Sequence, residues 1–167
     1  MIKTKSINTL ALGLVMAVST ISTNVSAAPQ GHLKVTSKVQ KLVVTNRNGK
    51  KVATYVPAAK VLPGETVQYN TFFQNVSNQP ANGITIVNPI PKHTVYLPNT
   101  AQGQNTVVSF SVNGGKSYAP KGALKVRGRD GKVRVAQPTD YTNVKWQYKG
   151  NLAPKATKSV GFKVRLR

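Results

Sequence analysis

The segment SVGFKVRLR, residues 159–167, alternates between apolar and cationic side chains. Its apolar members include Phe162, Val164 and Leu166, and its cationic members are Lys163, Arg165 and Arg167. Successive side chains of a β-strand point to opposite faces of the sheet, so one face of this segment is apolar and the other is cationic. The pattern predicts a strand that buries its apolar face and exposes its cationic face.

The same period of two recurs in short segments along the chain, whereas the 3.6-residue period of a helix is rare. Glycine, proline and asparagine separate these segments. Strands are predicted at residues 33–39, 42–45, 52–56, 66–75, 83–87, 94–97, 107–112, 123–127, 132–136, 144–148 and 159–166. Many short strands in a chain of 167 residues indicate an all-β fold. We expect an immunoglobulin-like antiparallel β-sandwich that forms one domain over residues 28–167.

Three dipeptides that accept positive φ angles lie between alternating segments and predict hairpin turns: Asn48-Gly49, Gly114-Gly115 and Asp130-Gly131. A two-residue turn at the third dipeptide fixes the register of its hairpin. The expected opposed pairs are Arg127 with Arg134, Arg129 with Lys132, and Val126 with Val135. In this register the valines share the buried face and the arginines share the exposed face.

Residues 1–27 have the three parts of a secretory signal peptide. Lys3 and Lys5 form a positive region, residues 10–18 are apolar, and residues 25–27 are small. The apolar run is shorter than the roughly 20 residues that span a bilayer. The chain has no cysteine, which excludes disulfides and a lipid-modified cysteine. We expect an exported protein with no membrane span after cleavage, in a bacterial periplasm, outside the cell or on its surface.

Several short motifs follow one another in a fixed order. They are VLPGETVQY at 61–69, Asn75, PIP at 89–91, TVYL at 94–97, FSVNGGKSY at 110–118, QPTDY at 137–141, VKW at 144–146, LAP at 152–154 and VGF at 160–162. In this series the chain resembles the domain of unknown function eleven, a conserved-repeat family of bacterial exported and surface proteins. The resemblance implies an immunoglobulin-like sandwich and an exported setting, and it transfers no catalytic residue. This chain has a single copy and is more basic than larger members, which argues against a spacer role in a repeat array.

The chain is strongly basic, with 24 lysines and arginines, three acids and a formal net charge of +21. This balance excludes an ordinary acidic cytosolic enzyme and indicates a polyanionic partner. The cations lie on both sides of a neutral section, residues 61–115, that holds Lys92 and Glu65. The candidate polyanion-binding residues, taken from the flanking strands and the third hairpin, are Lys34, Lys38, Lys125, Arg127, Arg129, Lys132, Arg134, Lys145, Lys163, Arg165 and Arg167. If the terminal strands share a sheet, these side chains form one basic face.

The residue types that catalysis and metal binding require are scarce. The histidines are His32 and His93, and the acids Glu65, Asp130 and Asp140 all form or follow predicted turns. This set does not provide a pair of carboxylates for acid–base chemistry, or a zinc or calcium site. The sequence has no glycine-rich phosphate loop. We expect no enzymatic activity, no catalytic or metal-binding residue and no cofactor.

The aromatic residues divide by their place in the alternation. Most alternate with polar residues and are expected in the core, with Trp146 between the sheets; the others are Tyr69, Phe110, Tyr148 and Phe162. Phe72 and Phe73 are consecutive, so one ring points outward from a regular strand. An outward ring would stack on a base or sugar, contact a partner, or pack under a neighbouring loop.

Several interpretations of function are compatible with these features. The favoured one is an exported, non-enzymatic structural or binding module that associates with an anionic cell-envelope polymer through a basic face. One alternative is nucleic-acid binding outside the cytoplasm, although no base-reading element is present. Another is an adhesin or assembly subunit that acts through strand edges. The fourth is a structural domain whose basicity suits its native medium. The oligomeric state and the identity of any ligand stay open.

Overall fold

The computed structural model describes residues 33–167. The strands in this region are β1 (Leu33–Arg47), β2 (Lys50–Pro57), β3 (Thr66–Asn75), β4 (Thr85–Pro89), β5 (Thr94–Tyr96), β6 (Gln102–Gly103), β7 (Thr106–Ser111), β8 (Lys125–Arg127), β9 (Val133–Val135), β10 (Asn143–Tyr148) and β11 (Thr157–Leu166). A short 3₁₀ helix, η1 (Pro138–Asp140), precedes β10. Every strand pair is antiparallel, and the prediction of an all-β fold is confirmed. The predicted signal peptide lies outside the described residues.

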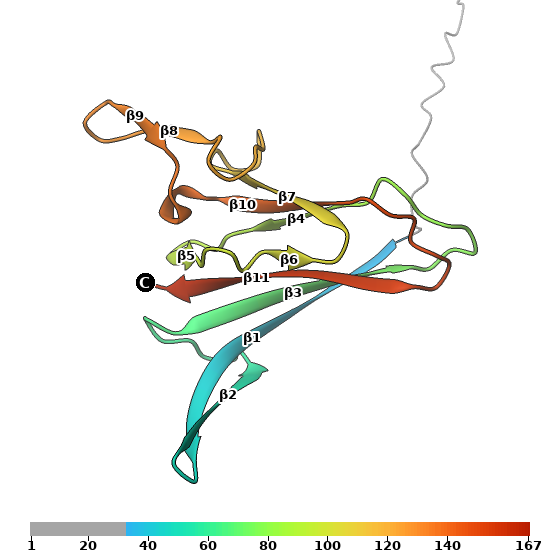
Figure 1. The fold of residues 1–167 in the computed structure, drawn as a ribbon, viewed down its shortest axis with the longest axis horizontal. Helices are drawn as coiled ribbons and strands as arrows, with labels where there is room; N and C mark the ends of the chain where they lie inside the picture. Colours follow the sequence, from blue (N-terminus) through green and yellow to red (C-terminus); the bar gives the residue numbers. More distant parts are fainter. Residues whose placement is uncertain (1–32) are drawn as a thin grey trace, which may run out of the picture. The chain divides into compact units, whose positions relative to one another are not determined.

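The strands form two main sheets and a separate hairpin (Figure 1). The large sheet has the order β2-β1-β3-β11-β5, and β6 also pairs with β11. The small sheet has the order β4-β10-β7, and among the described strands β8 pairs with β9 alone. The terminal strands β1 and β11 both lie in the large sheet, with β3 between them.

The core lies between the two main sheets. Trp146 of β10 is fully buried, and its ring centroid is 6.0 Å from that of Phe162 in β11. Phe73 of β3 meets Tyr148 of β10 edge to face at 5.8 Å. The predicted core aromatics are confirmed, since Phe110, Trp146, Tyr148 and Phe162 are buried and Tyr69 is half-buried against Phe162. Contacts between aromatic rings therefore hold the two sheets together.

β1 is one continuous strand of 15 residues, whereas the sequence predicts two strands at 33–39 and 42–45. Gln40 and Lys41 do not interrupt it because each pairs with β2 on one side and β3 on the other. The ammonium of Lys41 lies 3.2 Å from a carboxylate oxygen of Glu65, which gives this cation a partner on the inner side of the sheet. β6 was not predicted, because its two residues offer no alternation to detect.

Beyond β3, the strands β1 and β2 continue as a two-stranded ribbon that extends away from the other strands (Figure 1). Its turn is Asn48-Gly49, as predicted, and both residues have positive φ angles, 51° and 75°. Arg47 pairs with Lys50 across the turn, so the loop has two residues. A turn of this type matches the right-handed twist of the strands it joins.

The register predicted for the β8–β9 hairpin is wrong by one residue. Arg127 lies opposite Val133, and Val126 lies opposite Arg134. The loop is longer than two residues, because the amide of Gly128 donates to the carbonyl of Lys132 and Gly131 (φ 76°) donates to Gly128. This arrangement is a three-residue loop with a left-handed glycine. A shift of one residue exchanges the two faces, so Val133 and Val135 are exposed.

Candidate polyanion-binding surface

The face of the large sheet that points away from the small sheet carries four cations from two strands. We call it the outer face; its members are Lys34, Thr36, Lys38 and Gln40 of β1, Gln68, Asn70, Phe72 and Gln74 of β3, and Thr157, Ser159, Gly161, Lys163 and Arg165 of β11. Their neighbours in sequence face inward and include the buried Val67, Phe73 and Phe162. Alternation therefore decides which side chains reach this face.

The strand register places the cations of the outer face on both sides of a strip of uncharged residues. Lys38 lies opposite Asn70, which in turn lies opposite Gly161. One row further along, Gln68 lies between Gln40 and Lys163. The central strand β3 thus contributes amides and one aromatic ring, while β1 and β11 contribute the positive charges. Among residues 33–167, no acidic side chain belongs to this face, so no carboxylate on it offsets the positive potential.

Two of these cations lie over aromatic rings. The Lys38 ammonium is 5.5 Å from the centroid of the Phe72 ring, and the Lys163 ammonium is 5.3 Å from that of Tyr55 in β2. Such contacts hold a lysine beside a ring and leave its charge available to solvent. Phe72 is the outward member of the Phe72-Phe73 pair, as the alternation requires.

Lys145, another candidate, lies on the opposite side of the molecule. It belongs to the outward side of the small sheet, and its ammonium is 4.4 Å from the centroid of the Tyr118 ring. Its cross-strand neighbours are Val87 and Ser109. The terminal strands share a sheet, as the hypothesis of one basic face requires, but Lys145 is not part of that face, because β10 and β11 belong to different sheets.

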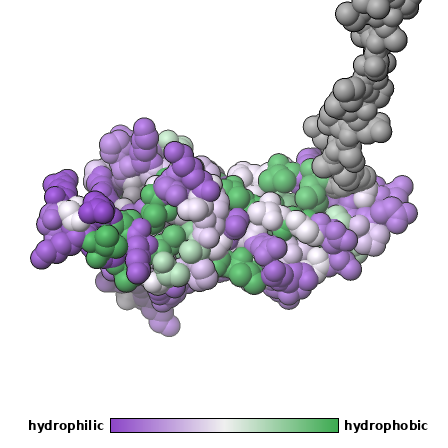
Figure 2. Space-filling view, turned by 90° about the horizontal axis from the view of Figure 1, so that it is seen from above, coloured by the Kyte–Doolittle hydropathy of each residue, from purple (hydrophilic) through white to green (hydrophobic). Residues whose placement is uncertain are grey.

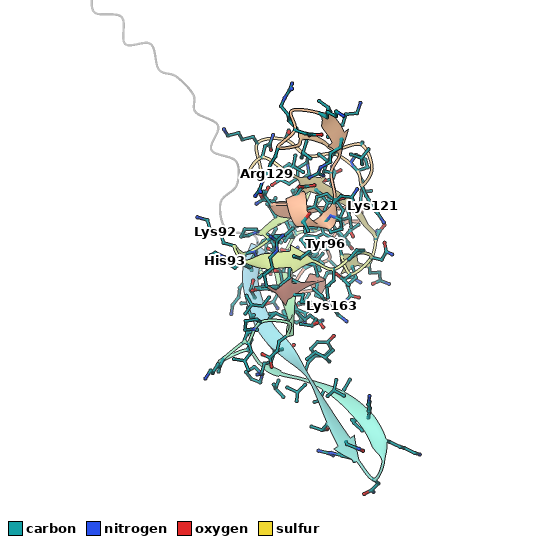
Figure 3. The ribbon with its side chains drawn as sticks, turned by 90° about the vertical axis from the view of Figure 1, so that its left-hand side faces the viewer. Lys92, His93, Tyr96, Lys121, Arg129 and Lys163 are labelled. Atoms are coloured by element: carbon teal, nitrogen blue, oxygen red, sulfur yellow. The ribbon has the colours of Figure 1, made fainter. Side chains whose placement is uncertain are left out.

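The hairpin cations form a third group. Lys125, Arg127, Arg129 and Lys132 are exposed, and Arg127 donates to the carbonyl of Gly131 at 2.7 Å. Figure 3 shows Arg129 and Lys163 on opposite sides of Tyr96. Figure 2 views the side that carries β8 and β9, where hydrophobic patches interrupt the hydrophilic surface. These cations are therefore separated from the outer face.

Arg134 differs from the other candidates because it has a carboxylate partner. Two of its nitrogens donate to Asp140, at 2.6 and 2.9 Å. This contact, followed by the backbone amide of Gln137, lowers the pKa of Asp140, and the same contact raises the pKa of Arg134. The pair anchors β9 to η1, so Arg134 is assigned a structural role. Arg167 lies at the chain end, where its amide donates to the carbonyl of His93.

The other acids of the described region also have local partners. Glu65 accepts from the backbone amide of Leu62 at 2.7 Å and from Lys41, and both contacts lower its pKa. Asp130 accepts from the amide of Lys132 within the hairpin loop. His93 sits in an exposed turn with a φ of 62°, and His32 lies outside the described residues. Residues 33–167 contain no group of three or more residues suited to hold a metal ion.

The amide strip of β3 was not among the predicted site residues. Its signal is present in the sequence, because Gln68, Asn70 and Gln74 recur at period two between inward-facing residues. These amides carry no charge, so the pattern of charged residues does not include them. In the folded sheet they lie between the cations, because β1 and β11 flank β3.

In residues 33–167, no helix has the length and apolar character needed to cross a membrane. Comparison of the chain with protein-family models, with curated proteins and with solved structures found no match.

Proposed function

We propose that this protein is an exported, non-enzymatic binding module that associates with anionic cell-envelope polymers through the outer face of its large sheet. The observation that carries the proposal is the acid-free arrangement of Lys34, Lys38, Lys163 and Arg165 on two strands of one face. Summed contacts from several such cations favour a ligand that repeats its negative charge. A nucleic acid is the alternative polyanion.

Two further features support a binding role rather than catalysis. Each acid in residues 33–167 accepts hydrogen bonds within its own turn or ion pair. Of the described cations, only Lys41 and Arg134 have a carboxylate within ion-pair distance. The positive charge that remains is available to a partner.

We also propose an immunoglobulin-like sandwich and membership of the domain of unknown function eleven. The ordered motifs of the sequence support this proposal, as do the two packed sheets with Trp146 between them. An experimental structure in which Trp146 is not enclosed by two sheets would contradict the fold.

Export is tested by mass spectrometry of the secreted chain, which should begin at Ala28. An uncleaved N-terminus would contradict export through a signal peptide.

The binding proposal is tested by charge reversal on the outer face. The double variant Lys34→Glu with Lys38→Glu should lower the affinity for lipopolysaccharide by at least about tenfold, because contacts between unit charges in water are each worth about 1 kcal/mol. The control variant Lys116→Glu with Lys121→Glu makes the same change in net charge at exposed loop positions outside this face. Its affinity should fall much less.

Binding to lipopolysaccharide and to duplex DNA across a salt series then separates the two polyanions. Retention of lipopolysaccharide at salt concentrations that release DNA supports the envelope ligand. If the protein binds lipopolysaccharide and DNA equally weakly, and both double variants lose the same affinity, the interaction is nonspecific attraction between opposite charges and the proposal fails.

A second function, assembly through strand edges, is favoured by the ribbon of β1 and β2. β2 pairs with β1 alone and leaves its other edge unpaired among the described residues, and the ribbon exposes Val44 and Val52. Unpaired edges accept strands from other chains. Light scattering over a range of concentrations should show a rise in mass if the ribbon assembles, and a constant monomeric mass would exclude this function.

A further inference from the structure

The outer face is hollowed on both sides of Phe72. The larger hollow has a volume of about 510 Å³ and includes Asn70, Gln102, Gln104 and Ser159 in its lining. The smaller hollow has about 160 Å³ and includes Lys34 and Gln74. Both hollows are lined by Phe72 and Thr157, so we call them together the Phe72 groove. The larger volume lies in the range of small-molecule sites, about 300–1,000 Å³.

The floor of the larger hollow depends on a glycine within a strand. Gly161 lies opposite Asn70 of β3 on one side and Gln102 of β6 on the other. A Cβ atom at this position would lie 2.5 Å from the Asn70 side-chain oxygen and 2.8 Å from the Tyr69 carbonyl oxygen. A side chain therefore does not fit at residue 161, and no side chain from this residue fills the hollow on the outer face. Glycine inside a strand commonly marks such a close approach.

The polar groups of the groove suit hydroxyl groups. A side-chain amide has two N–H donors and an acceptor oxygen, so it pairs with hydroxyls, which both donate and accept. Four amides contribute, Asn70 and Gln74 from β3 and Gln102 and Gln104 from β6 and its turn, and Thr157 and Ser159 add hydroxyls. A ligand rich in hydroxyls matches this lining better than one rich in phosphates.

The ring and the cations complete the chemistry of the groove. Phe72 offers a flat apolar surface of the kind that packs on the C–H face of a sugar ring. Lys34 lines the smaller hollow, and Lys158 lines the larger one, where its ammonium donates to Gln104 at 2.9 Å. Lys158 lies opposite the inward Phe73, so the outer-face cations beside the ring are Lys34 and Lys38, and the Lys38 ammonium is 5.5 Å from the ring centroid. Among the described residues that line the groove, Phe72 is the one aromatic, whereas sites for single-stranded nucleic acid stack successive bases on several rings.

We propose that the Phe72 groove binds an acidic polysaccharide of the uronate class, with one sugar ring on Phe72, its hydroxyls on the flanking amides and its carboxylates near Lys34 and Lys38. This inference rests on the proposed polyanion-binding function and names the ligand class of the same surface. Charge alone would hold any polyanion, whereas the ring and the amides select a sugar.

The test compares two oligomers of equal charge, oligogalacturonate and polyphosphate, by titration calorimetry with the full chain. Phe72→Leu keeps apolar bulk and removes the flat ring. This variant should lose about tenfold in affinity for oligogalacturonate, the upper range of one aromatic contact, and should keep its affinity for polyphosphate. Gln104→Ala, at an exposed position, should lose severalfold for oligogalacturonate only.

The matched control is Tyr118→Leu. Tyr118 also has a lysine ammonium over its ring, but it belongs to the opposite side of the molecule beside Lys145. This variant should bind both oligomers as the wild type does. Circular dichroism and thermal unfolding of each variant establish that the fold is intact.

Each other outcome has a defined meaning. If the wild type binds neither oligomer, the proposed polyanion function and this inference both fail. If it binds polyphosphate at least as tightly as oligogalacturonate, or if Phe72→Leu loses nothing, polyanion binding stands and the sugar site is overturned. A loss in Phe72→Leu seen for oligothymidylate and not for oligogalacturonate would assign the ring to a nucleobase, which also overturns the sugar site.

Discussion

At the residue scale, the acids have the clearest individual roles. Asp140 accepts two hydrogen bonds from Arg134 and one from the amide of Gln137, and it joins β9 to η1. Glu65 joins the turn at Leu62 to Lys41 of β1. Each carboxylate thus links segments that have no strand pairing with each other. In a chain with three acids, two serve as cross-links and the third, Asp130, stabilises a hairpin loop.

Asp140→Asn should lower the free energy of unfolding by about 1 kcal/mol, because the pair is partly exposed and solvent screens it. The pKa values of Asp140 and Glu65 are lowered in the folded chain. Their contribution to the free energy of unfolding is therefore fully present when the pH is above their ordinary pKa values of 3.8 and 4.5, and it is lost as the pH falls below these values. Thermal unfolding between pH 7 and 2 measures this loss. The variant should show a shallower acid dependence, and an unchanged slope would contradict the role of Asp140.

Phe162 is the second residue whose substitution has a defined result. Its ring is 1% exposed and contacts both Trp146 and Tyr69. Phe162→Ala should cost about 3–5 kcal/mol, the usual range for removal of a buried aromatic side chain. Urea denaturation measures the change, with Phe72→Ala on the outer face as the comparison. A smaller loss at Phe162 than at Phe72 would mean that the two sheets are not held by this core.

At the element scale, Gly131 allows the three-residue loop of the β8–β9 hairpin to close. The glycine has a φ of 76° and closes the loop with Gly128. Its register brings Leu124 and Ala136 together on the buried side, since the amide of Ala136 donates to the carbonyl of Leu124. Arg134 lies on the same side and meets Asp140, so burial and an ion pair together select this register over the predicted one.

Gly131→Ala should destabilise this hairpin by about 1 kcal/mol, because a residue with a Cβ is disfavoured at a positive φ. The effect should be local, since within the described part of the chain β8 and β9 pair only with each other. Amide hydrogen exchange should accelerate in β9 and not in β3 or β11. Lys132→Ala, next to it in the same loop, serves as the control. Uniform acceleration throughout the chain would show instead that the hairpin is part of the global folding unit.

Most strands could be predicted from the sequence because their apolar residues recur at period two. The central strand β3 has the predicted bounds of residues 66–75, and Asn48-Gly49 gave the correct turn. The hairpin register could not be predicted, because Asp130-Gly131 suits both a two-residue and a three-residue loop. The site was predicted in part. Period-two cations identified Lys34, Lys38, Lys163 and Arg165, but the sheet assignment of β10 depends on long-range pairing, which separates Lys145 from them.

At the scale of the whole molecule, the dominant feature is like charge. All three acids and all but two of the 24 basic residues belong to the described region, which therefore repels itself. The cations are distributed over the outer face, the small sheet, the β8–β9 hairpin and the ribbon. This distribution reduces repulsion between any two groups and leaves each surface positive.

The thermal midpoint should rise by about 3 °C when sodium chloride is raised from 10 to 150 mM. The screening length falls from about 30 to about 8 Å over this range, which weakens repulsion between the separated groups. Differential scanning calorimetry measures the shift, and sodium fluoride at matched concentrations distinguishes screening from chloride binding. A midpoint that falls with salt would mean that the two ion pairs outweigh the repulsion.

The ribbon has a practical consequence for protein engineering. Residues 44–54 are exposed, the buried core has no member among them, and the Phe72 groove is lined by other residues. Exposed loop tips of this kind accept inserted sequence. The Asn48-Gly49 turn is therefore a permissive position for grafting an epitope or a labelling tag, at which the inserted peptide is displayed without disturbing the sheets behind it.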